Sequence, residues 1–168
     1  MQPNARLAVA VLTLFSCATA QVADGGADAA KCEAYVVPTT TDLTTPQVSF
    51  RNDVMPLFDQ TCGFSSCHGS PASARVFLGL NPGTGDPAKV RPGIVGVMSK
   101  ALPTMALVAA SDPSKSFLLH KIDGDACTFK KECAGEDCGV SMPERSPLLD
   151  VKSRDTIRRW VAQGAGDN

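Results

Sequence analysis

The chain has 168 residues, a formal net charge of −1 and an isoelectric point near 6.1. This length fits one domain with a terminal extension better than two domains, and the near-neutral charge gives no indication of a basic surface for nucleic-acid binding. Aromatic residues make up only 5% of the chain, so its core is one that a large apolar cofactor could complete, although aliphatic side chains alone also fill small cores.

The first twenty residues have the three parts of an export signal. Arg6 gives a positive start, residues 7–15 form an apolar run, and residues 18–20 form a small-residue cleavage site. The run is too short to span a bilayer as a stable helix. Residues 14–17 also resemble a lipoprotein cleavage box, which would leave Cys17 as a lipidated N-terminus. Both alternatives predict an exported protein, periplasmic or outer-membrane-associated, that meets a membrane only through a lipid anchor at Cys17.

Residues 21–47 are predicted to be a flexible tether that precedes the domain at 48–168. The segment is rich in Ala, Asp, Gly, Thr and Pro and shows no apolar periodicity. Cys32 is the exception, because a cysteine there can pin the tether to the domain.

The domain begins with a predicted helix over about 53–60. Asn52 or Asp53 can cap this helix, and Pro56 falls in its first turn, where no helical hydrogen bond is lost. The next segment, 69–93, contains many Gly and Pro residues and is expected to be a loop.

Three further helical segments are expected after that loop. A short apolar piece at 94–102 predicts two helical turns, and Asp112-Pro113 predicts the start of a helix that ends at Gly124. The last helix covers about 153–163 and carries Trp160 on its apolar face. Because no segment alternates as a strand does, the predicted fold class is all-α.

Seven cysteines are encoded, and Cys17 is either removed or acylated. In an oxidising compartment the other six are expected to be used in disulfides, metal or haem. Either all six form three disulfides, or two disulfides accompany a haem-attached pair. Disulfides are favoured over zinc for Cys32, Cys127, Cys133 and Cys138, since structural zinc sites use closer pairs and a fourth ligand. The pairing of these four cysteines stays open.

The segment Cys62-Gly-Phe-Ser-Ser-Cys67-His68 is the candidate site. Thioether bonds from two thiols attach haem c, and a histidine directly after the second cysteine is placed as an axial ligand of the iron. The usual spacing is C-x-x-C-H. Here four residues separate the thiols, so two extra residues must bulge outward. The alternative is a Cys62–Cys67 disulfide with an incidental His68 beside it.

The order of motifs over residues 48–168 resembles that of small exported c-type cytochrome domains. The resemblance rests on Phe50 to Phe58, the cysteine motif with Gly69, Gly79-Leu80, Asp112-Pro113, Ser116 to Ile122, Ser141-Met142-Pro143, and Ile157 to Ala165. It implies a cytochrome c-like fold in which the first and last helices cross beside a haem pocket. It also implies one covalently attached haem c, with His68 as the proximal ligand and Met142 as the distal ligand.

His120 is the competing distal ligand. It lies off the Leu118/Ile122 stripe of its helix, which favours a hydrogen-bonding or solvent-facing role. Met142 precedes Pro143, which restrains the backbone and could hold a thioether in place.

These observations predict a mono-haem electron carrier that is not an enzyme and whose partners are other exported or membrane redox proteins. The alternative function is a haem-free, disulfide-stapled secreted or lipoprotein binding module on the same helical scaffold.

Overall fold

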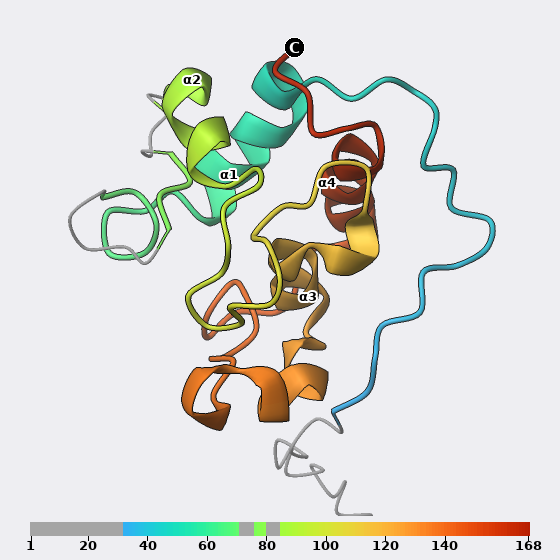
Figure 1. Ribbon diagram of the computed structural model, residues 1–168. Coiled ribbons are helices and arrows are strands. Elements are labelled where there is room, and N and C mark those ends of the chain that lie inside the picture. Colours follow the sequence, from blue (N-terminus) through green and yellow to red (C-terminus); the bar gives the residue numbers. More distant parts are fainter. Residues whose placement is uncertain (1–31, 71–75, 80–84) are drawn as a thin grey trace, which may run out of the picture. The chain divides into compact units, whose positions relative to one another are not determined.

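The chain divides after Lys31, and the computed structural model describes residues 32–70, 76–79 and 85–168, all within the second part, Cys32–Asn168. The predicted signal peptide, residues 1–20, and the start of the predicted tether lie outside the described residues. Secondary structure in the described ranges is helical, and pairing between extended segments there is confined to isolated bridges. The all-α prediction is confirmed for this part of the chain (Figure 1).

The first helix starts with a π-helical turn, η1 (Phe50–Val54), and continues as α1 (Met55–Thr61). Its cap is Ser49, whose hydroxyl accepts a hydrogen bond from the Asn52 amide at 3.0 Å. The prediction of a start near Asp53 is therefore wrong by about one turn. The reason lies in packing: the wide π turn puts the first and last residues of η1 on one face, and both are fully buried.

The middle of the chain differs from the prediction in two places. The expected loop at 69–93 contains a short helical piece formed by α2 (Pro87–Val90) and η2 (Arg91–Gly93). The helix expected at 94–102 is absent, because Gly96 adopts a φ of +73°, outside the helical region. That segment instead pairs with residues 105–108 through isolated bridges.

The second half of the domain is built on α3 (Phe117–Asp123) and α4 (Val151–Ala162), which pack against each other. As predicted, α3 ends at Gly124, which has a φ of +81°. The start expected at Asp112 is a separate 3₁₀ turn. The 3₁₀ turns here are η3 (Pro113–Lys115), η4 (Ala126–Glu132) and η5 (Ala134–Glu136). No helix within the described ranges is long and apolar enough to cross a bilayer.

The core centres on the contact between the first and last helices. The Trp160 indole stacks on the Phe50 ring at a centroid distance of 4.8 Å and an interplanar angle of 23°. Phe58 meets Phe50 in a T-shaped contact at a centroid distance of 6.4 Å. All three rings are at most 1% exposed, and the indole N–H donates to the Gly166 carbonyl at 2.9 Å. The first and last helical segments are therefore in contact through these rings.

Residues 32–47 form neither helix nor strand, yet they are attached to the helical part. Their contacts include a disulfide from Cys32 to Cys127, a 2.8 Å hydrogen bond from the Tyr35 amide to Asp125, and 3.0 Å hydrogen bonds from the Gln163 amide group to the carbonyls of Thr44 and Pro46. The second half of the segment expected to be a flexible tether is thus held by side chains of η4, α4 and the turn after α3.

Trp160→Ala is expected to lower the free energy of unfolding by about 3–5 kcal/mol, the usual cost of removing a buried large aromatic ring. Chemical denaturation measures the loss. Lys152→Ala on the exposed side of α4 is the matched control and should change stability by less than about 0.5 kcal/mol. An equal, small effect for both substitutions would contradict the packing described above.

Candidate functional site

The cysteine motif forms a loop that closes on itself. Cys62 follows the last residue of α1, and the amides of Cys62 and Gly63 both donate to the Phe58 carbonyl, at 2.8 and 2.7 Å. The His68 amide then donates back to the Cys62 carbonyl at 3.1 Å. The four residues 64–67 between these points are exposed. The extra length of the C-x4-C-H spacing is therefore accommodated by an outward turn that leaves Cys62 and His68 adjacent.

Gly69 closes the loop by a backbone approach that a larger residue would prevent. A Cβ atom at this position would lie 2.1 Å from the Gly63 carbonyl oxygen and 2.8 Å from the Phe64 carbonyl carbon. Both of these are backbone atoms, so no rotamer change can relieve the clash. The glycine after His68 is thus a requirement of the loop.

Cys62 and Cys67 are both free thiols, the first buried and the second exposed. The Thr61 hydroxyl donates to the Leu57 carbonyl at 2.6 Å and also lies 3.2 Å from the Cys62 sulfur. Because that hydroxyl has one hydrogen, the Cys62 S–H is the donor of the second contact. Burial raises the pKa of the Cys62 thiol, which keeps it protonated and slow in disulfide exchange.

His68 is oriented by a backbone carbonyl. Its Nδ1 lies 2.9 Å from the Val76 carbonyl oxygen, which can only accept, so Nδ1 carries the hydrogen. In the neutral ring this fixes the tautomer and leaves a lone pair on Nε2. Backbone carbonyls that accept from the other ring nitrogen orient metal-binding histidines in the same way. The Leu78 amide donates to the His68 carbonyl at 3.0 Å and holds the neighbouring segment in place.

Met142 lies in the irregular chain between η5 and α4. Its amide donates to the Lys121 carbonyl at 2.8 Å, and its half-buried side chain packs against the main apolar cluster. Cys62 and Leu78 belong to this cluster, and Val76 packs against it. Cys62 and Met142 thus both contact the main apolar cluster, which extends through the core from Val48 to Ala165. Cys67 lies on the exposed turn.

His120 has a different environment. Its Nδ1 lies 2.9 Å from the Asp125 carboxylate and its Nε2 lies 3.1 Å from the Ser114 carbonyl. Both neighbours are acceptors, so both ring nitrogens donate and the ring is the charged imidazolium. Burial by itself lowers the His120 pKa, but the hydrogen bonds to Asp125 and Ser114 outweigh it and raise the pKa overall. The expected hydrogen-bonding role of His120 is confirmed.

A buried charge network lies between α3 and α4, and the sequence analysis missed it. Arg158 is 1% exposed; it donates to both Asp123 oxygens, at 2.7 and 2.6 Å, and also contacts Asp155. Arg154 donates to Asp123 at 2.9 Å and lies over the Tyr35 ring at 4.7 Å. The positions next to the apolar stripe of α4 gave no signal of burial, because arginines flanking such a stripe are normally solvated.

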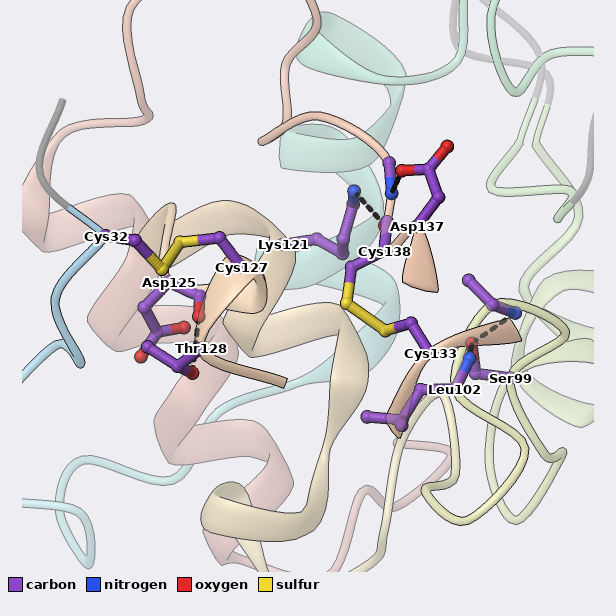
Figure 2. The surroundings of a disulfide bond; sticks show 12 residues. Cys32, Ser99, Leu102, Lys121, Asp125, Cys127, Thr128, Cys133, Asp137 and Cys138 are labelled. Atoms are coloured by element: carbon purple, nitrogen blue, oxygen red, sulfur yellow. Dashed lines mark hydrogen bonds between the residues drawn. A yellow bond between two sulfur atoms is a disulfide. The ribbon is translucent and has the colours of Figure 1, made fainter. Parts of the chain in front are cut away.

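Two disulfides account for the other four cysteines in the described ranges, as Figure 2 shows. Cys32 pairs with Cys127 across a sequence separation of 95 residues, and Cys133 pairs with Cys138 across 5. The prediction that these four are oxidised is confirmed, and the pairing that sequence left open is now assigned. Within the described ranges no group of three or more His, Cys, Asp or Glu side chains is arranged to hold a metal ion, so the zinc alternative has no site there.

Comparison with known proteins gives no relative: no protein-family model, no curated protein and no solved structure matches the chain.

The His120–Asp125 pair is expected to make stability depend on pH. Burial raises the Asp125 pKa, but hydrogen bonds from His120 and Tyr35 outweigh it and lower the pKa. Because the His120 pKa is raised in the folded state, its contribution to the free energy of unfolding is fully present below the ordinary pKa of 6.5. That contribution is lost as pH rises through the pKa of the folded state. The lowered aspartate pKa gives stability that is present above the ordinary value of 3.8 and is lost as pH falls.

Asp125→Asn should therefore reduce the unfolding free energy more at about pH 5.5 than at about pH 8.5, because the stability from the raised His120 pKa is lost as pH rises through that pKa. Urea denaturation at the two pH values measures the difference. Asp86→Asn, which alters a carboxylate that accepts from the Ala88 amide and has no contact with His120, is the control. An equal loss for Asp125→Asn at both pH values would contradict the charged pair.

Proposed function

We propose that the chain is a mono-haem c-type cytochrome that carries electrons outside the cytoplasm. Haem c would be attached to Cys62 and Cys67 and ligated by His68 and Met142. The observation that carries the proposal is the state of the cysteines. Among the described residues, the four cysteines outside the motif are bonded in pairs, whereas Cys62 and Cys67 are free thiols and Cys67 directly precedes His68. Thioether attachment of haem needs these groups in this order.

The donor groups fit a haem iron. His68 offers the Nε2 lone pair that its bond to the Val76 carbonyl leaves available, and Met142 offers a soft, neutral thioether. Cys62 and Met142 both lie against the main apolar cluster, and an apolar surround is what a porphyrin ring requires. Haem, when bound, supplies one-electron transfer by cycling its iron between two oxidation states.

The chain's own residues provide the binding and orientation. The outward turn at 64–67 places His68 beside Cys62, the Val76 carbonyl fixes the imidazole tautomer, and the buried cluster excludes water. Charge and solvent access around the iron then set its potential. Because an electron carrier transforms no substrate, the proposed function is not that of an enzyme and involves no catalytic residue.

The proposal also includes location and partners. The protein would be exported, with residues 1–20 removed or with Cys17 lipidated, and would reside in the periplasm or at the outer membrane. Its partners would be exported or membrane redox proteins that approach a partly exposed haem edge. Phe64, which is 45% exposed within the motif, gives such a partner an apolar contact next to the attachment site.

The second candidate is a haem-free, disulfide-stapled secreted or lipoprotein binding module. One observation favours it: the thiols are separated by four residues rather than the usual two. It requires a structural bridge between Cys62 and Cys67, which are free in the structure.

Covalent haem is expected to depend on both motif thiols. The full chain is expressed in cells that mature c-type cytochromes, and haem staining follows denaturing electrophoresis. Cys62→Ser and Cys67→Ser should each lower the covalent haem yield strongly. The double substitution Cys32→Ser/Cys127→Ser, which removes one disulfide elsewhere, should keep covalent haem. A wild-type protein without stain under these conditions would contradict the proposal and favour the binding module.

Met142, rather than His120, is expected to complete the iron's coordination. Methionine favours ferrous iron, so Met142→Ala should abolish the sulfur-to-iron charge-transfer band and lower the reduction potential while covalent haem remains. His120→Gln should leave both observables nearly unchanged, because both His120 nitrogens already bond to Asp125 and Ser114. Visible spectroscopy measures the charge-transfer band, and redox titration measures the reduction potential. The reverse pattern would indicate bis-histidine ligation.

A further inference from the structure

A single residue of α3, Lys121, holds the loop that leads to Met142. Its ammonium group donates to the Cys138 carbonyl at 2.9 Å and also to the Val140 carbonyl. Its own backbone carbonyl accepts from the Met142 amide at 2.8 Å. Figure 2 shows the side chain reaching from α3 to the Cys138 carbonyl. Alternate residues of the loop, at 138, 140 and 142, are thus tied to one position.

Helix geometry explains why this position can hold the loop. The last four carbonyls of a helix have no partner within it, and the Lys121 carbonyl is one of these because α3 ends at Asp123. The Met142 amide supplies that partner. The side chain adds a compact cation with three donors, which also lies 5.9 Å from the centre of the Phe117 ring one turn earlier.

The loop is shaped to receive the ammonium group. Gly139, between the two bonded carbonyls, has a φ of +68°, and a Cβ atom there would lie 3.3 Å from the Lys121 nitrogen. Upstream, the buried Cys133–Cys138 disulfide limits the positions that the Cys138 carbonyl can take. Lys121 therefore acts on a segment that is already fixed at one end.

We infer that Lys121 is a positioning residue for Met142: it holds loop 138–142 so that the thioether stays against the apolar cluster as an iron ligand. The inference rests on the proposed function, since it concerns the ligand assigned there. A thioether is a weak, neutral ligand, so its bond to iron depends on how firmly the protein holds it, and loss of that bond lowers the potential.

The test compares Lys121→Met, which keeps a long side chain without donors, with Lys121→Arg, which retains donors. All variants are the full chain, matured with haem. Lys121→Met should keep covalent haem, weaken the charge-transfer band and lower the potential, and Lys121→Arg should recover most of both. Hydrogen exchange of the 138–142 peptide should rise roughly tenfold in Lys121→Met, as expected for loss of hydrogen bonds to a charged group, while exchange in α4 stays unchanged.

Lys115→Met is the matched control, because Lys115 is an exposed lysine of η3 and should change neither spectrum nor exchange. A Lys121→Met protein with wild-type band, potential and exchange would overturn the inference while leaving the proposed function intact. A wild-type protein that carries no covalent haem would overturn the proposed function and with it the role of Met142. The haem content of the wild type therefore separates the two failures.

Discussion

Trp160 and Phe50 bring the two ends of the domain together, and the position of the candidate site depends on that contact. The stacked rings fix α4 against η1, and the terminal residue adds hydrogen bonds: Asn168 accepts from the Phe50 amide at 3.0 Å and from the Arg51 amide at 3.2 Å. Because η1 continues directly into α1, this contact fixes the position of α1. Cys62 directly follows α1, so the position of the buried thiol depends on contacts with residues far along the sequence.

The C-terminal end of α3 holds two further segments of the chain. His120 there forms the buried pair with Asp125, which in turn accepts the Tyr35 amide of the N-terminal segment. Lys121, the next residue, receives the Met142 amide. The Cys32–Cys127 disulfide reinforces the first attachment, and a cross-link of this span is worth roughly 4–5 kcal/mol in the chain-entropy account. One short helix thereby fixes both the N-terminal segment and the predicted distal ligand.

Sequence signals predicted the structure correctly where neighbouring residues alone decide it. Gly124 ends α3 because glycine tolerates a positive φ, the stripe containing Trp160 indicated a buried face, and export predicted that Cys32, Cys127, Cys133 and Cys138 are oxidised. Non-local contacts could not be predicted. The apolar run at 94–102 pairs with residues 105–108 because Gly96 leaves the helical region. Arg154 and Arg158 are buried because Asp123 on another helix pairs with both of them, and Asp155 also pairs with Arg158.

The central claim is that the free thiols Cys62 and Cys67 carry haem beside His68, and peptide mapping tests it most directly. Trypsin releases residues 52–75, which contain both thiols and no internal Lys or Arg. Protein from maturation-competent cells is digested without reduction, after alkylation of free thiols, and analysed by mass spectrometry. The account predicts that this peptide carries the mass of one haem and no alkyl group. A peptide found with both thiols alkylated, or two hydrogens lighter through an internal disulfide, would contradict it.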